Sequence, residues 1–320
     1  MGIMVAINFS IANPLSEKLF TFEDDLCEVT FKYKKYKELI VLSAKLNNSI
    51  AVNLIFDTGT RSTILFGKKF QKYVNSFTTH TISFSGLGNG VPLMGKVSLD
   101  NELKFNGLKG SGMAILVVPS RKFFSEMSYI DGIIGYDLLK YFEIEVNPRR
   151  STITFRSPEN NSVSDEFVKF NLNDSEVVPI LSGQIDAILH TKNVLPLLID
   201  TGSQLGVLLK SQQLNPYDCE IFARGLSGHI KGIEAYGKVF HIGEVPLTSD
   251  FLFSVIPTDR DEMLSIGMDF LKDYVFIINI VELYVAFKAP KNKQQKEKSR
   301  VPLTEIAQKM NPHVDPHSLQ

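Results

Sequence analysis

The sequence predicts a mostly β protein made of two similar halves, and three observations support this. An apolar run followed by a carboxylate, two small residues and a hydroxyl occurs twice, at 54–60 and at 197–203. A second repeated phrase follows each copy, at 133–140 and at 265–272, so the chain carries an internal repeat. Between these phrases, short apolar runs are bounded by turn residues, which is typical of strands.

In the first half, the strand pattern begins near Glu28, where apolar and polar residues alternate. Two apolar runs, 39–46 and 50–56, are separated by Asn47-Asn48, which predicts a hairpin. This hairpin would deliver Asp57 to a tight turn in which Gly59 allows close backbone approach. We expect a strand end and a short helix within the next stretch, 64–73.

A glycine-rich stretch follows at 85–95. A phosphate-binding loop needs a helix N-terminus after it, but residues 96–99 alternate like a strand. We therefore interpret 85–95 as the tip of a hairpin, and 224–232 as its counterpart in the second half. The alternative is that both are tight turns with no function as a lid.

The remaining elements occur in the same order in both halves. We expect an apolar strand at 114–118, then short helices and paired strands at 136–141, 142–146 and 151–155, and again at 268–274, 275–280 and 283–288. The polar stretch 157–174 predicts a linker. The expected organisation is an N-terminal segment at 1–27, an N-terminal lobe at 28–160, a C-terminal lobe at 161–290, and a basic, flexible tail at 291–320.

Composition excludes several functional classes. The 320 residues, 44% of them hydrophobic, can bury a large core. Lys plus Arg number 34 against 35 for Asp plus Glu, so no electrostatic footprint indicates nucleic acid or a membrane surface. No apolar stretch approaches the ~18 residues that span a bilayer. Cys27 and Cys219 form neither a metal-ligand spacing nor a disulfide framework, and we expect no metal and no cofactor.

The N-terminal segment has two interpretations. Residues 1–12 are apolar and uncharged, and Ser10-Ile11-Ala12 resembles a signal-peptidase site, but the basic start of a secretory signal is missing. The segment is either an ordinary N-terminus or the remnant of an export signal.

Other hydrolytic chemistries lack their motifs. The six histidines form no H-E-x-x-H, and the chain has no Gly-x-Ser-x-Gly. Paired carboxylates also serve glycosidases, but glycosidases do not require a repeated Asp-Thr-Gly.

The two phrases Asp57-Thr58-Gly59-Thr60 and Asp200-Thr201-Gly202-Ser203 resemble the aspartic peptidases of the pepsin and retropepsin type. Ile133-Ile134-Gly135 matches the strand that crosses behind the Asp-Thr-Gly turn in that family, whereas Ser265 departs from the second copy of this pattern. The likeness is closest to bacterial aspartyl peptidases with two retropepsin-like halves, and its architecture covers about 28–288. It implies the bilobal acid-protease barrel fold, with the active site between the lobes.

The resemblance implies an aspartic endopeptidase whose catalytic Asp57 and Asp200 share a proton and activate a water. It assigns supporting roles to Thr58, Gly59, Thr60, Thr201, Gly202, Ser203, Gly135 and Gly267, and flap or substrate-binding roles to Gly86, Leu87, Gly88, Gly225, Leu226 and Ser227. We expect the hydroxyls of Thr60 and Ser203 to donate to the carboxylates and so to lower the dyad's first pKa, which predicts an acidic optimum.

The partner that we expect is an extended peptide or protein substrate with hydrophobic side chains near the scissile bond. Both aspartates lie in one chain, so the expected state is a monomer. Relatives of this type are exported, which favours a periplasmic, cell-envelope or secreted location over the cytoplasm. The alternative function is a peptide-binding protein on the same fold that hydrolyses weakly or not at all.

Overall fold

The computed structural model describes residues 19–88, 90–124, 126–159, 163–173, 178–184, 194–243 and 245–288. The protein is mostly β, as the sequence predicts, and its strands form three mixed or antiparallel sheets. Among the described residues, no helix is long and apolar enough to cross a membrane. The expected tail at 291–320 and most of the N-terminal segment lie outside the described residues.

A nine-stranded sheet belongs to the first half. Its strands are β1 (Phe20–Phe22), β3 (Lys34–Tyr36), β4 (Leu39–Leu46), β5 (Ile50–Phe56), β6 (Thr63–Phe66), β7 (Phe77–Phe84), β8 (Leu93–Phe105), β9 (Leu108–Val118) and β10 (Gly132–Ile134). The hydrogen-bonded path β9-β6-β10-β5-β4-β8 returns to its start because β8 also pairs with β9. Strand β1 pairs with β9, so this sheet begins before residue 28.

A seven-stranded sheet belongs to the second half. Its strands are β14 (Ile180–Gln184), β15 (Leu195–Ile199), β16 (Val207–Ser211), β17 (Glu220–Gly225), β18 (Gly228–Ile242), β19 (Val245–Pro257) and β20 (Met263–Ile266). Its path β19-β16-β20-β15-β14-β18 also returns to its start, because β18 pairs with β19. The two paths match strand for strand, including the parallel pairs β5–β10 and β15–β20.

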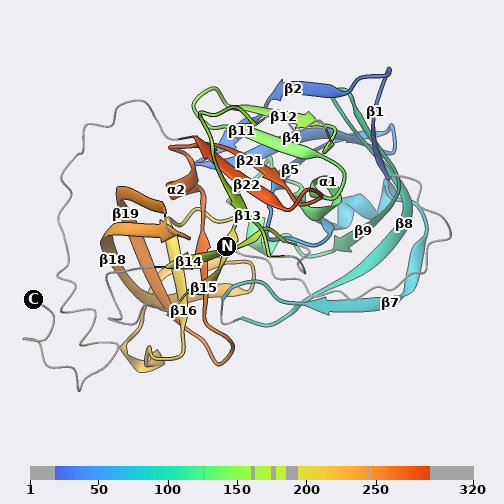
Figure 1. The fold of residues 1–320 in the computed structure, drawn as a ribbon. Helices are drawn as coiled ribbons and strands as arrows, with labels where there is room; N and C mark the ends of the chain where they lie inside the picture. The colour runs from blue at the N-terminus through green and yellow to red at the C-terminus, as the bar shows by residue number, and fades with distance from the viewer. Residues whose placement is uncertain are drawn as a thin grey trace, which may run out of the picture.

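A third sheet of six strands joins the halves. Its strands are β2 (Glu28–Lys32), β11 (Glu143–Asn147), β12 (Thr152–Arg156), β13 (Val168–Asn171), β21 (Val275–Asn279) and β22 (Tyr284–Lys288). At its centre, β11 pairs antiparallel with β21. Figure 1 shows these strands at the upper centre, between the sheet of the first half on the right and that of the second half on the left.

Strand β13 lies inside the stretch 157–174 that the sequence marks as a linker. Most of its residues are polar, but Phe170 packs against the core, and the centre of its ring lies 6.0 Å from that of Phe287. The expected linker therefore contains an edge strand of the shared sheet.

The hairpin that precedes Asp57 is confirmed. Strands β4 and β5 have the predicted bounds, and Asn47 and Asn48 adopt φ values of 46° and 53°. Asparagine tolerates this left-handed conformation better than most residues, and two such residues match the twist of a tight hairpin.

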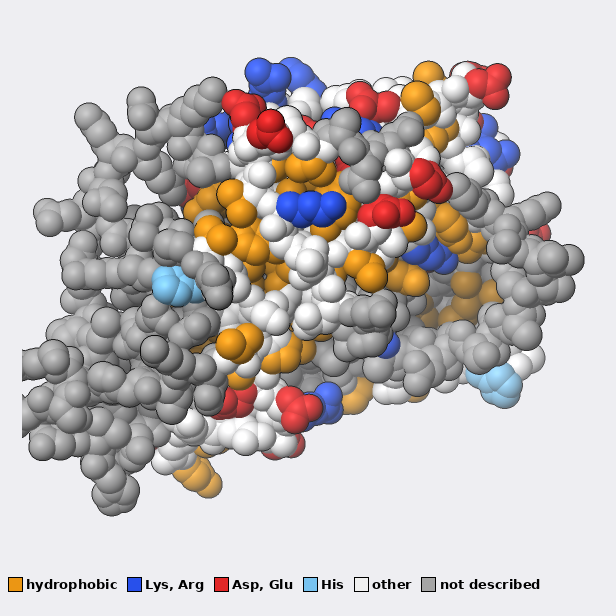
Figure 2. Space-filling model, viewed as in Figure 1, with side chains coloured by type: hydrophobic (Ala, Val, Ile, Leu, Met, Phe, Trp, Pro, Cys, Tyr) orange, Lys and Arg blue, Asp and Glu red, His pale blue; other side chains and the backbone are white. Residues whose placement is uncertain are grey.

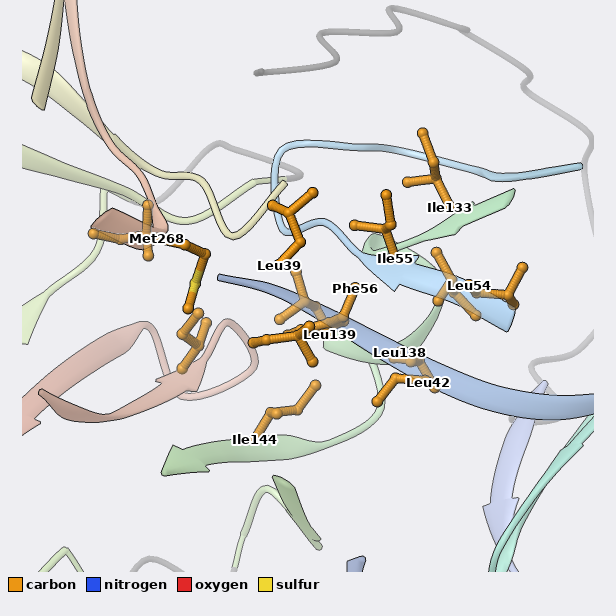
Figure 3. Close-up of a cluster of buried hydrophobic side chains, with 14 of the residues drawn as sticks. Leu39, Leu42, Leu54, Ile55, Phe56, Ile133, Leu138, Leu139, Ile144 and Met268 are labelled. Atoms are coloured by element: carbon orange, nitrogen blue, oxygen red, sulfur yellow. The ribbon is translucent and has the colours of Figure 1, made fainter. Parts of the chain in front are cut away.

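Two of the three predicted helices form as short α-helices, and the one expected within 64–73 is a 3-10 turn. The α-helices are α1 (Tyr136–Leu139) and α2 (Met268–Leu271), and 3-10 turns occupy Lys68–Lys72, Lys122–Phe124 and Pro216–Asp218. In Figure 3, Met268 of α2 belongs to the same cluster of buried apolar side chains as Leu39, Leu139 and Ile144 of the first half. One apolar core therefore extends through both halves.

Candidate active site

Equivalent strands deliver the two aspartates. Asp57 follows β5, and its N–H donates to the carbonyl of Ile134 at 2.8 Å. Asp200 follows β15, and its N–H donates to the carbonyl of Ile266 at 2.9 Å. Each carboxyl therefore stands at the end of a buried strand that lies parallel to the strand of the second repeated phrase.

Ser265, which departs from the expected apolar pattern, does not prevent this arrangement. It is buried in β20, between Leu198 of β15 and Leu208 of β16. The main-chain pairing on both sides holds the strand in place, so the second half has the same local frame as the first.

Two threonines connect the turns across the pseudo-symmetric interface. Thr58 Oγ1 donates to the carbonyl of Ile199 at 2.5 Å, and Thr201 Oγ1 donates to the carbonyl of Phe56 at 2.7 Å. Each hydroxyl also accepts from the N–H of the other threonine, at 3.0 and 3.1 Å. Both side chains are fully buried. This reciprocal set fixes the two turns relative to each other, as the sequence resemblance implies.

The two carboxyl groups face each other in a buried space. The Oδ1 atoms of Asp57 and Asp200 lie 3.3 and 3.4 Å from the place that a methyl group on Gly59 would take. A methyl group on Gly202 would lie 2.1 Å from Asp57 Cγ. The second turn therefore requires glycine, because the Asp57 carboxyl occupies the space of a Cβ there.

Burial raises the pKa of Asp57 well above its ordinary value of 3.8, and the charge of Asp200 raises it further. Burial also raises the pKa of Asp200, while the Gly202 N–H and the charge of Lys210 act in the opposite direction. The two carboxyls interact directly, so the pair titrates as a unit.

One of the two expected hydroxyl donors differs from the prediction, because Thr60 Oγ1 donates to the carbonyl of Ser62 at 3.4 Å. Ser203 Oγ accepts from the N–H of Leu205 at 3.2 Å. Backbone N–H groups of the turns donate to both carboxyls: Gly59 N–H to Asp57 Oδ1 at 2.9 Å, and Gly202 N–H to Asp200 Oδ1 at 3.0 Å.

The two glycines of the second phrase lie against these turns. A methyl group on Gly135 would lie 1.9 Å from the carbonyl oxygen of Asp57, and one on Gly267 would lie 2.4 Å from that of Leu205. Their lack of a side chain is what allows the crossing strands to approach the turns.

Asp137 is a supporting residue that the sequence interpretation missed. Its Oδ2 accepts from the N–H of Thr63 at 2.9 Å and from Thr63 Oγ1 at 2.7 Å, and burial raises the pKa of the Asp137 carboxyl. It thereby ties α1 to the start of β6, directly after the Asp57 turn. The sequence contains a signal for this role, because Gly-x-Asp recurs at the same place in the two halves, at 135–137 and 267–269.

Lys210 is a second residue that sequence reasoning missed. It lies on β16 and is half-buried, and desolvation lowers the pKa of its amine while the charge of Asp200 acts in the opposite direction. The sequence gives only a weak signal for this role, because a lysine after the apolar pair Leu208-Leu209 is also common at the exposed end of a strand.

The two predicted flap tips contact each other. The N–H of Gly86 donates to Ser227 Oγ at 2.9 Å, and the N–H of Ser227 donates to the carbonyl of Leu87 at 3.0 Å. A methyl group on Gly225 would lie 2.1 Å from the Leu87 carbonyl oxygen. The tips of the β7–β8 and β17–β18 hairpins therefore fit together through their backbones.

Two further contacts bring the remaining predicted flap residues into the same junction. A methyl group on Gly86 would lie 2.7 Å from Leu226 Cβ, and one on Gly88 would lie 2.6 Å from the carbonyl oxygen of Gly228. The glycine-rich composition of both stretches thus reflects close approach of one hairpin to the other.

Among the described residues, no group of three or more His, Cys, Asp or Glu side chains is arranged to hold a metal ion. The chain matches no model of a known protein family, and its sequence has no significant match among curated proteins.

Proposed function

We propose that the chain is an aspartic endopeptidase of the two-lobed type, with Asp57 and Asp200 as its catalytic pair. The observation that carries this proposal is the buried carboxyl pair, whose members stand at equivalent strand ends and are fixed by the reciprocal bonds of Thr58 and Thr201. The matching strand order of the two halves supports the bilobal acid-protease fold. In this reading the lobes correspond to 28–160 and 161–290, and one monomer holds a complete site.

The chemistry needs one proton on the pair. The ionised carboxyl takes a proton from a water bound between Asp57 and Asp200, while the protonated one donates to the carbonyl oxygen of the peptide bond. The attack forms a C–O bond and a tetrahedral diol, and its collapse breaks the C–N bond as the amine takes a proton. The hairpin tips at Gly86 and Ser227 would open to admit an extended peptide and close over it.

The pH dependence follows from burial of the pair. Because the pKa values of both carboxyls are raised, the acidic limb of kcat/KM should lie above pH 3.8, the ordinary value for aspartate. This revises the sequence-based expectation of a low first pKa, which depended on hydroxyl donors at Thr60 and Ser203.

The test is cleavage of an unbiased peptide mixture between about pH 3 and pH 8, a range that brackets such a pair. The wild type is compared with Asp57→Asn and with Asp200→Asn, and products are identified by mass spectrometry. We expect the wild type to cleave and each single variant to lose activity by at least about a thousandfold, since the pair acts as a unit.

The alternative, a peptide-binding protein on this fold, makes a different prediction in the same experiment. Peptides would be retained by the wild type and by both variants, with no new termini at any pH. That result, obtained with a correctly folded wild type, would remove the peptidase assignment.

A further inference from the structure

A cavity of about 700 Å³ lies beside the junction of the two hairpins. This volume falls within the roughly 300–1,000 Å³ that is usual for ligand pockets. Its floor is apolar and buried, made by Phe66 at the end of β6, Val118 at the end of β9, and Leu226 at the tip of the second hairpin. Both halves of the chain therefore contribute to one cavity.

The rim of this cavity is basic. Lys122 stands on one side, and Arg224 and His229, which face each other across the β17–β18 hairpin, stand on the other. All three side chains are exposed, and no lining residue within the described part of the chain is acidic. Within the same part of the chain, none of the three forms a salt bridge. The Lys122 ammonium, the Arg224 guanidinium and the His229 ring can all donate N–H hydrogen bonds, so the rim suits a carboxylate.

A second cavity of about 380 Å³ adjoins the first and shares Met94 and Pro119 with it. Val91 and Met94, which line the first cavity, are 82% and 52% exposed. Neighbouring cavities with exposed apolar side chains fit a polypeptide segment better than an isolated small anion.

The cavity also adjoins the hairpin tips that the proposed function places over the substrate. Leu226 and Ser227, at the tip of the second hairpin, line it, and Ser227 Oγ accepts from the Gly86 N–H at the tip of the first hairpin at 2.9 Å.

We propose that this cavity is a substrate subsite that selects an acidic side chain next to an apolar one, away from the scissile bond itself. The apolar side chain occupies the floor at Phe66 and Leu226, and the carboxylate lies between Arg224, His229 and Lys122. This inference rests on the proposed peptidase function, because it takes the occupant to be the substrate.

The experiment uses the Asp57→Asn full-length chain, so that binding is measured without cleavage. The probes are labelled octapeptides with two central apolar residues, in which one Glu, Gln or Lys is moved through each outer position. We expect one position at which the Glu peptide binds at least about fivefold tighter than the Gln peptide. This ratio is the size of effect that one or two partly exposed ion pairs produce. That preference should disappear when Arg224→Gln and Lys122→Gln are added, and should persist with Lys32→Gln, an exposed control on β2.

Three results would overturn the inference. They are equal affinity for the Glu and Gln peptides at every position, a Glu preference that survives the double substitution, and displacement of the peptide by inorganic phosphate or an oligonucleotide at similar concentrations. Thermal unfolding of each variant checks that it is folded.

Cleavage by the chain with Asp57 restored separates this inference from the peptidase proposal. Binding that prefers Glu, without any cleavage, would support the acidic subsite and contradict the peptidase proposal. Cleavage with no preference for Glu would support the peptidase proposal and contradict the acidic subsite.

Discussion

Gly202 and Gly59 occupy equivalent places in the two turns, yet their surroundings differ. A methyl group on Gly202 would fall within 2.1 Å of Asp57 Cγ, whereas one on Gly59 would be no closer than 3.3 Å to its nearest neighbour. We expect Gly202→Ala to lower kcat by at least about a hundredfold, the usual cost of moving a catalytic group by about 1 Å. Gly59→Ala serves as the matched control with a smaller loss. Equal losses in the steady-state assay would contradict this asymmetry.

The raised pKa of Asp57 also predicts a change in stability. A carboxyl whose pKa is higher in the folded than in the unfolded chain favours folding at low pH, and this contribution is lost as pH rises from 3.8 through the folded-state pKa. Asp57→Asn removes the ionising group, so the variant should be more stable than the wild type at pH 7.

Thermal unfolding checks this prediction. We expect Asp57→Asn to raise Tm at pH 7 by at least about 2 °C, the change that ~1 kcal/mol produces in a chain of this size, and the gain to vanish below about pH 4, near the ordinary aspartate value. Asp165→Asn, an exposed carboxyl, is the control and should change Tm little at either pH. An unchanged Tm for Asp57→Asn at pH 7 would argue against a buried, like-charged pair.

At the scale of elements, the two hairpins depend on Ser227, whose hydroxyl accepts from the Gly86 N–H and whose side chain is buried. Ser227→Ala removes one hydrogen bond worth about 0.5–1.5 kcal/mol. We expect faster hydrogen exchange at the Gly86 amide, measured by NMR, with exchange in β5 unchanged. Ser85→Ala, an exposed residue of the same loop, is the control. Equal exchange at Gly86 in both variants would mean that backbone contacts alone hold the tips together.

At the scale of the whole molecule, the shared sheet holds the halves together through a buried polar group. Glu143 of β11 accepts from the Tyr284 hydroxyl and from Asn279 Nδ2 of the second half, and it lies 3.5 Å from Arg156 Nη1. The face in Figure 2 carries both acidic and basic side chains among apolar ones.

We expect Glu143→Ala to lower the free energy of unfolding by about 3 kcal/mol, because it leaves the buried Tyr284 hydroxyl and Asn279 amide without their hydrogen-bond acceptor. Denaturant unfolding followed by circular dichroism measures this. Glu282→Gln, an exposed residue in the β21–β22 turn, is the control and should lie within about 0.5 kcal/mol of the wild type. Independent unfolding of the two halves in the wild type would contradict a structural role for the shared sheet.

The sequence by itself determined the local features. The repeated phrases, the Asn47-Asn48 hairpin and the glycine-rich tips depend on patterns of neighbouring residues, which fix strand periodicity and turn conformation. These patterns alone mark Asp57 and Asp200 as candidate catalytic residues.

Only the tertiary structure decided how distant residues meet. It placed the Thr60 hydroxyl on Ser62, tied Asp137 to Thr63, and showed that the polar stretch 157–174 contains β13. It also brought Lys122 of the first half and Arg224 of the second to the rim of one cavity. The charge of Asp200, which raises the pKa of Asp57, comes from a residue more than a hundred positions away in the chain, and the bond between Asp137 and Thr63 joins residues 74 positions apart. Single-sequence patterns carry no information on such pairs, because periodicity extends only over neighbouring residues.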